Sequence, residues 1–527
     1  MLLAPCTMPL LQAQDTYMNE RITNNSSDVI GTARYVGMGG ALGALGADMS
    51  VISWNPAGIG LFRKTDIAVT FGGTWGKSRI DEENRGKGTI DQAGFVISRK
   101  MDNDASLKYL NFAFNYQKKI NFNHNFYADN YNLGGLSQMD QLAELTQFDT
   151  GQNNLAGLAI DSKFFNALTD DEGNVLTDDE GRNILYNDYA SSSNIFTHHS
   201  EGSLQSFDFN LSTNLNDRAF FGLTLGIDNM RYRGWDLYGE NDMTPQRNGT
   251  YDLHRDIVIS GTGVNVKLGA IVRPFADNSF RVGLVIESPT WYRLRNSTLF
   301  YLNNYIKGIE SREIESYLPF SIRSPWKVRT SIGSTIGRTF AWDIDYEYAT
   351  YSGTSMSTRE EYEDGSSSSS TKDVAMNQLT RDILRGTHTL RAGIEVNATK
   401  NLAFRVGYNL STSAYEKIVN FNQCSLNSVA MDYATSTHFM RLGSTNILTL
   451  GVGYHAKKFY IDLAYKVRNQ KGDFYAFDTG FANSVTGDPV FLKLDEQNNT
   501  NLANKTIKPV GVDLTRHAVT CTLGFKF

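Results

Sequence analysis

The chain has 527 residues, of which 41% are hydrophobic and 20% charged, and its mean hydropathy is -0.35. This composition excludes a disordered chain, and the sequence lacks the roughly 18 consecutive apolar residues that a membrane-spanning helix needs. A net charge of -6 argues against nucleic-acid binding, which needs clustered Lys and Arg. A membrane β-barrel stays open, because its strands alternate apolar and polar residues and average to a modest hydropathy.

The N-terminus has features of a secretory signal peptide. Residues 1–13 are largely apolar and end on Ala13 before a polar stretch, so we expect cleavage there. No Lys or Arg precedes the apolar run, so the true start of the signal is expected further upstream; an ordinary disordered N-terminus is the alternative. With Cys6 removed, Cys424 and Cys521 stand far apart, which supports neither a disulfide framework nor a cysteine metal site.

Alternation of apolar and polar residues recurs along the chain and predicts fourteen strands. They lie near 66–73, 92–100, 107–117, 203–213, 219–230, 257–272, 279–288, 326–337, 340–351, 388–398, 402–411, 446–456, 458–468 and 516–527. Brief turns and long connections alternate strictly between them. An even strand number with short turns on one side and long loops on the other is typical of an outer-membrane barrel, with both termini in the periplasm.

We therefore expect an all-β fold, a 14-stranded antiparallel transmembrane β-barrel. Because lipid offers backbone groups no water, the sheet must close and present its apolar face outward. The charged residues of the alternating strands are then expected to face the lumen: Asp345, Glu347, Arg391, Glu395, Asp462 and Lys466. A large soluble β-sandwich or propeller is the alternative, which explains the alternation but not the rhythm of the connections.

The end of the chain supports the barrel. In the segment 517–527, apolar residues occupy alternate positions and the chain ends on Phe525, Lys526 and Phe527. An apolar alternating strand that ends on Phe resembles the C-terminal signal by which outer-membrane barrels are recognised for assembly. The barrel assembly machinery is thus an expected partner.

The long connections contain two notable patterns. Residues 137–147 have apolar positions at helical spacing, which predicts a helix that either covers the barrel mouth or packs on its own loop. The repeats at 169–173 and 177–181 are acidic but lack the ligand spacing of an EF-hand, so we interpret them as solvated turns of a β-excursion.

Catalytic, metal and cofactor motifs are weak. The sequence has neither an H-E-x-x-H pair nor a G-x-S-x-G elbow, and an isolated pair such as His198 and His199 is usually solvated rather than bound to a metal or haem. We expect no cofactor, no metal and no enzymatic activity. The glycine cluster 37–46 has the wrong spacing for a dinucleotide site and is interpreted as a small-residue segment packed in a confined lumen.

Two N-terminal phrases point to a family. The stretch Thr32–Ala41 followed by Trp54, Asn55, Pro56, Ala57 and Gly58 resembles the plug region of the FadL/TodX family of outer-membrane transporters for hydrophobic compounds. The Asn-Pro-Ala triplet matches the family's plug motif. The segments 288–292 and 324–327 are also similar to parts of bacterial members.

The resemblance implies an organisation and a mechanism. Residues 14–62 would be a luminal hatch and residues 63–527 the barrel, in the outer membrane of a Gram-negative bacterium. Hydrophobic small molecules such as long-chain fatty acids would be captured in an extracellular pocket, pass as the hatch moves, and leave sideways near the third strand into the membrane lipids. From their positions, Trp235, Trp291 and Tyr292 are candidate ligand contacts.

Two other functions stay open. The same N-terminal phrases fit a PorV-like barrel that serves as a docking or shuttle protein for secreted proteins. An outer-membrane lipid hydrolase that assembles its residues from separate strands is the third hypothesis. A general diffusion porin is disfavoured by the long N-terminal plug.

Overall fold

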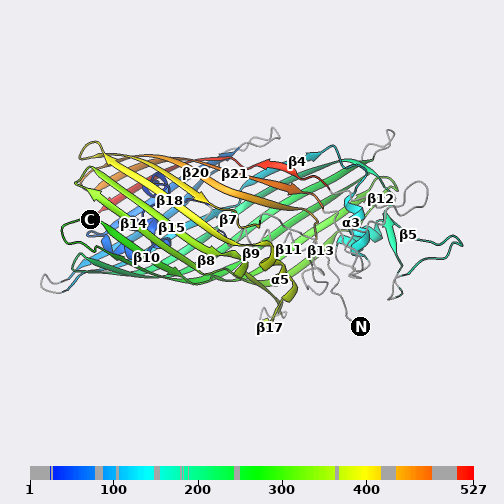
Figure 1. Cartoon of the computed structure of the whole chain (residues 1–527), viewed down its shortest axis with the longest axis horizontal. Coiled ribbons are helices and arrows are strands. Elements are labelled where there is room, and N and C mark those ends of the chain that lie inside the picture. The colour runs from blue at the N-terminus through cyan, green and yellow to red at the C-terminus, as the bar shows by residue number, and fades with distance from the viewer. Residues whose placement is uncertain are drawn as a thin grey trace.

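Fourteen strands close into one antiparallel barrel in this computed structural model (Figure 1). The structure describes residues 24, 28–76, 87–101, 106–146, 155–177, 181, 183–187, 189–242, 250–361, 367–416, 435–477 and 507–527. The predicted signal peptide, Cys6 and Cys424 lie outside these residues. Within them, no helix has the length and apolar character needed to cross a membrane.

Each barrel strand pairs with a neighbour on either side, and the last returns to the first. The ring consists of β1 (Asp66–Gly76), β2 (Lys87–Lys100), β3 (Leu107–Asn121), β7 (Ser191–Leu215), β8 (Ala219–Asp242), β9 (Tyr251–Val272), β10 (Arg281–Glu287), β14 (Lys327–Ile336), β15 (Phe340–Thr350), β18 (Gly386–Asn397), β19 (Leu402–Ser411), β20 (Phe439–His455), β21 (Phe459–Tyr475) and β23 (Arg516–Lys526). Closure runs from Asp66 opposite Lys526 to Gly76 opposite Arg516. The predicted 14-stranded barrel is confirmed.

An apolar belt surrounds the outside of the barrel. On β8 the exposed side chains are Phe221, Leu223, Leu225 and Ile227, and the other strands repeat the pattern. Aromatic clusters border the belt at both edges. One consists of Trp75, Tyr465 and His517, and the other of Phe275, Phe280 and Trp342. A band of this kind between aromatic girdles is the exterior that a bilayer requires.

Several strands continue beyond the belt and, together with additional strands, extend the barrel wall on the long-loop side. We call this part the upper wall. Its additional strands are β4 (His124–Asn130), β11 (Trp291–Asn304), β12 (Ile309–Glu310), β13 (Ile314–Arg323), β16 (Ser355–Glu361), β17 (Ser367–Lys372) and β22 (Val510–Asp513). β11 pairs with the upper half of β9, and β13 joins β11 to β16. The predicted loops 118–202, 289–325 and 352–387 are therefore partly wrong, since each contributes strands to this wall.

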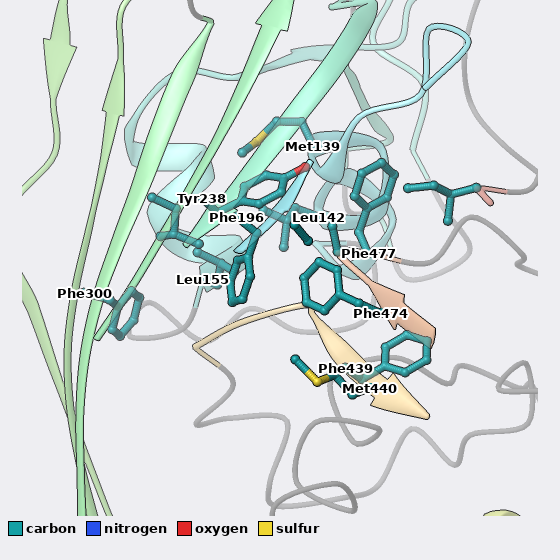
Figure 2. Packing of buried hydrophobic residues seen from close by; sticks show 14 of the residues in the cluster. Met139, Leu142, Leu155, Phe196, Tyr238, Phe300, Phe439, Met440, Phe474 and Phe477 are labelled. Atoms are coloured by element: carbon teal, nitrogen blue, oxygen red, sulfur yellow. The ribbon is translucent and has the colours of Figure 1, made fainter. Parts of the chain in front are cut away.

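Loop segments fill the opening of the upper wall. The helices are α3 (Gln138–Leu145), α4 (Leu155–Asp161) and α5 (Val374–Ile383), and η4 (Tyr351–Gly353) is a short 3₁₀ turn. Met139 and Leu142 of α3 are fully buried beside aromatic residues of the wall such as Phe196 and Phe474 (Figure 2). The predicted helix is confirmed, and it packs on the barrel mouth. We call the buried apolar residues packed here, which include Met139, Leu142, Phe196 and Phe474, the cap cluster.

The first acidic repeat, 169–173, belongs to a small excursion outside the barrel, and of the second repeat only residues 177 and 181 are among the described residues. β5 (Phe165–Ala167) pairs with β6 (Leu185–Asn187), and isolated bridges join Thr169 to Val175 and Thr177 to Asn183. This agrees with the predicted turns of a β-excursion.

Candidate functional site

The continuous described stretch before the first strand lies inside the barrel. Residues 28–62, which we call the N-terminal segment, contain α2 (Ala33–Gly37), η2 (Met49–Ser53) and η3 (Pro56–Leu61). The segment is coloured blue inside the end of the barrel that holds the C-terminus (Figure 1). The side chains of Thr32, Asp48 and Asn55 precede these three helices, and each accepts a hydrogen bond from a backbone N–H in the first turn of the helix that follows it.

Glycines of the wall let the N-terminal segment approach the strands. A Cβ added at Gly407 of β19 would lie 2.1 Å from the backbone nitrogen of Gly39, and one at Gly269 of β9 would lie 2.3 Å from Asn55. Gly39 itself has φ +65, a conformation that favours glycine. The glycine cluster 37–46 is therefore a small-residue segment packed in the lumen, as predicted.

Two carboxylates of β15 bind the backbone of the N-terminal segment. Asp343 Oδ2 accepts the N–H groups of Ala44 and Leu45 at 3.0 and 2.7 Å. Asp345 Oδ2 accepts the N–H of Gly43 at 3.2 Å and the indole Nε1–H of Trp54 at 2.8 Å. These four hydrogen bonds satisfy buried donors and hold the turn of the segment against the wall.

The indole ring of Trp54 contacts two guanidinium groups. The guanidinium carbon of Arg391 lies 3.5 Å from the ring centroid and that of Arg329 lies 4.3 Å away. Arg329 Nη1 also donates to the carbonyl oxygen of Trp54 at 3.2 Å, and Arg391 Nη1 donates to the hydroxyl of Tyr35 at 2.6 Å. Indole faces attract cations most strongly where water is excluded, as it is around this buried ring.

The Asn-Pro-Ala-Gly motif forms the turn that follows Trp54. Asn55 Nδ2 donates to the carbonyl oxygen of Gly43 at 2.7 Å, and its Oδ1 accepts the N–H of Ala57 at 3.2 Å. Pro56 occupies the first position of η3, where a missing N–H costs nothing. Gly58 packs against Gly46. The motif therefore crosslinks two turns of the N-terminal segment, a structural task; its assignment to a moving hatch stays a prediction.

The start of the segment is bound by an ion pair to β21. Lys466 Nζ contacts Asp28 Oδ1 at 2.5 Å and donates to the carbonyl oxygen of Val29 at 2.7 Å. Burial raises the pKa of the Asp28 carboxyl, but the positive charges of Lys466 and Arg468 outweigh it and hold that pKa at about 2. Asp28 therefore stays ionised at neutral pH.

Buried ion pairs cross the lumen above the N-terminal segment. Arg329 bridges Glu287 at 2.5 Å and Glu347 at 2.6 Å, and Lys119 contacts Asp228 at 2.7 Å. The six charged residues predicted to face the lumen are all buried or nearly so and bonded to partners inside the barrel. Buried charges are stable only when paired, and these charges meet that requirement.

Above the charged layer the interior becomes apolar. The inner apolar cluster brings together side chains from β7, β8, β9, β11, β13, β16 and α5 with Phe122, which follows β3. Its members are Phe122, Leu204, Met230, Tyr232, Ile257, Ile259, Tyr292, Leu294, Leu318, Phe320, Ile322, Met356 and Met376. Along the barrel axis, an apolar region therefore lies between the charged lumen and the long-loop end.

A buried polar cluster borders the cap cluster. His198 Nδ1 bonds to Asp236, Arg255 Nε donates to Asp236 Oδ2 at 2.7 Å, and Arg255 Nη2 lies 3.5 Å from His438 Nε2. Burial lowers the pKa of His438 to about 3, against the opposing charge of Asp236. His199 instead stacks on Trp235 at 6.1 Å. Among the described residues, no group of three or more His, Cys, Asp or Glu is arranged to hold a metal.

The wall has a seam between β2 and β3. Their backbone pairing ends at Gln92 opposite Gln117, although both strands continue within the described residues. Beyond this point β3 pairs only with β7, with a register shift between Lys118 and Ile120. Lys118 Nζ contacts Asp91 Oδ1 at 3.0 Å across the seam. A side-chain ion pair there takes the place of the ladder hydrogen bonds.

The end of the barrel with the short turns opens into a polar vestibule. Its cavity has a volume of about 750 Å³ and is bordered by charged residues that include Arg34, Asp48, Glu395 and Lys526. Arg34 Nε contacts Glu395 at 3.0 Å at its inner end. The N-terminal segment forms the floor between this vestibule and the charged lumen.

The structure separates the three candidate ligand contacts. Trp235 and Trp291 are 40% and 52% exposed on the outer face, whereas Tyr292 is 2% exposed and its hydroxyl donates to Asp228 at 2.8 Å. Successive residues of a strand point to opposite faces, so Trp291 and Tyr292 cannot contact one ligand together. The inner apolar cluster went unnoticed in the sequence because most of its members come from segments that were expected to be loops, whereas Leu204, Met230, Ile257 and Ile259 lie in predicted strands.

Solved structures of outer-membrane channels are similar to this chain over nearly its full length. A FadL homologue from Pseudomonas aeruginosa has 11% identity and a TM-score of 0.49, with 95% of this chain and 100% of that chain covered. The toluene transporter TodX from Pseudomonas putida has 10% identity and a TM-score of 0.45, over 95% and 98%. The monoaromatic hydrocarbon channel CymD has 11% identity and a TM-score of 0.47, over 95% and 98%.

No protein-family model and no curated protein matches the sequence. At these identities and TM-scores the structural likenesses carry no argument about function. The strand register and the closure of the ring establish the fold.

Proposed function

We propose that the protein is an outer-membrane channel for passive uptake of hydrophobic small molecules, with long-chain fatty acids as one substrate class. The observation that carries the proposal is the change of the interior along the barrel axis. It is apolar behind the cap cluster and is charged and filled by the N-terminal segment toward the vestibule. A ligand moved from water to the apolar region gains about 25 cal/mol per Å² of apolar surface buried.

The exit in this proposal is the seam between β2 and β3. An apolar ligand that leaves the inner apolar cluster meets the buried ion pairs of the lumen, which disfavour an axial route. The seam lies at the side of that layer, and separating Asp91 from Lys118 breaks one ion pair but no backbone ladder. The N-terminal segment serves as the hatch, because its residues 28–30 border the cavity behind the seam.

Crosslinking across the seam tests the route. The double variant Asp91→Cys/Lys118→Cys joined by a short bis-maleimide should lose uptake of a labelled fatty acid into cells, and the same variant without linker should retain it. The matched control is Lys100→Cys/Tyr109→Cys, which crosslinks the same two strands where they are already paired. Uptake that persists after complete crosslinking of the seam pair would refute lateral release there.

A further inference from the structure

A patch of arginines stands on the outer face just beyond the apolar belt. On β8 the outward position Arg231 follows Asn229 and Ile227, the residue that ends the unbroken outward apolar run from Phe221. On β11 the outward positions after Trp291 are Arg293 and Arg295, and on β13 the outward position nearest the belt is Arg323. All four arginines are exposed. We call them the outer basic patch.

Strand register brings these arginines together. Ser260 of β9 lies opposite Arg231 on one side and Arg295 on the other, so the two arginines are roughly 10 Å apart across two strand spacings. Thr262 lies opposite Arg293 on one side and Asn229 on the other. The β9 residues between the arginines thus carry small hydroxyl side chains, which leave room for a group held between neighbouring guanidinium forks.

The patch lies at the edge of the membrane band. Trp291, which lies opposite Arg323 in the register, is 52% exposed and Trp326 is 60% exposed, and indole rings prefer the boundary between hydrocarbon and headgroups. In the register, Val264 of β9 lies opposite Trp291 on one side and Ile227 of β8 on the other, and both are exposed. An amphiphile that rests its acyl chains on this belt therefore brings its headgroup to the arginines.

We propose that the outer basic patch binds the phosphate groups of an anionic lipid in the leaflet on the long-loop side. Arginine presents planar donor pairs that match phosphate oxygens, and it is hydrated less strongly than lysine. A phosphorylated glycolipid with acyl chains fits both parts of the surface, the apolar belt and the cationic row. This inference rests on the position of the barrel in the membrane and is independent of uptake.

Native mass spectrometry of the detergent-purified protein tests the proposal. The probes are a bis-phosphorylated lipid A, the same lipid without its phosphates, and inorganic phosphate. The variant Arg231→Gln/Arg293→Gln/Arg295→Gln should bind the phosphorylated lipid about tenfold more weakly than the unmodified protein. A matched variant, Lys64→Gln/Arg99→Gln/Arg218→Gln, removes three exposed positive charges at the opposite rim and should bind it unchanged.

Each of three results would overturn the proposal: equal lipid binding by the patch variant, equal binding of the dephosphorylated lipid, or displacement of the lipid by inorganic phosphate alone. The first denies the arginines a role, the second denies the phosphate a role, and the third makes free phosphate the ligand. Heat-resistant migration of both variants on gels establishes that the barrel is intact, and uptake should be the same in both.

Discussion

Replacing Trp54 should release the N-terminal segment without unfolding the barrel. Trp54 contributes a hydrogen bond to Asp345 and contacts with the guanidinium groups of Arg329 and Arg391. Truncating a buried Trp to Ala costs about 3–5 kcal/mol. The strands keep their own ladders, so this loss falls on the docking of the segment.

Hydrogen exchange measures that docking directly. At a loss of about 4 kcal/mol, the open state of the segment becomes about a thousandfold more populated, and its protected amides should exchange faster by the same factor. The amides of Ala44 and Leu45, which donate to Asp343, are the reporters. Trp54→Phe keeps an aromatic ring but removes the indole donor, and it should show an intermediate effect of about 1.5–3 kcal/mol.

Trp326→Ala is the matched control, because it removes an indole of the outer face that is 60% exposed. It should leave exchange of the N-terminal segment unchanged. If Trp54→Ala also leaves the Ala44 and Leu45 amides as protected as in the unmodified protein, then Trp54 does not hold the segment and the reasoning fails.

Three further changes test separate parts of the structure. Gly407→Val should displace the N-terminal segment and raise ion conductance, since even a Cβ would lie 2.1 Å from Gly39, whereas Gly73→Val, with nothing within 4 Å, should not; equal conductance would contradict the packing. The low pKa of His438 means that the folded cap cluster disfavours its protonation, so the stabilisation is complete above about pH 6.5 and declines as the pH falls toward 3. The protection factors of residues 435–442, which correct the exchange rates for the intrinsic rate at each pH, should accordingly fall between pH 7.5 and 5, and His438→Gln should abolish that fall. Tyr292→Ala should lower fatty-acid uptake, because Tyr292 belongs to the inner apolar cluster, whereas Trp235→Ala on the outer face should not; the reverse ranking would place the ligand outside the barrel.

The membrane part of the fold could be predicted from the sequence because each strand there meets lipid on one side and a polar lumen on the other. On β21, Phe459, Ile461 and Leu463 face outward while Asp462 and Lys466 face inward, so the alternation shows in the sequence itself. Bounds were close for the same reason: the strand predicted at 402–411 is Leu402–Ser411.

The strands of the upper wall were not predicted, because the alternation of apolar and polar residues is reversed there relative to the membrane strands. On β11, Arg293 and Arg295 point outward while Tyr292 and Leu294 point to the interior, so the apolar residues face inward as in a soluble protein. Because its outward positions are polar, this stretch does not match the pattern of a membrane strand and was predicted to be a loop. Bulges such as Ser288–Thr290 between β10 and β11 interrupt the period as well.

The contacts of the N-terminal segment could not be predicted residue by residue. Trp54 meets Arg329 and Arg391 only because the ring closes and its register brings β14 and β18 to the same height around the segment. The sequence provided the motif and the inward charges, but not their pairing. Long-range partners of this kind are set by closure, which no local pattern encodes.

Photolabelling with a diazirine fatty acid is the most direct test of the central claim that an apolar ligand occupies the interior of the barrel. The account predicts labels on inward residues of the inner apolar cluster, such as Met230 and Met356, and near the seam at Lys118, with competition by unlabelled fatty acid. Labels confined to the outer belt and unaffected by competition would contradict the account.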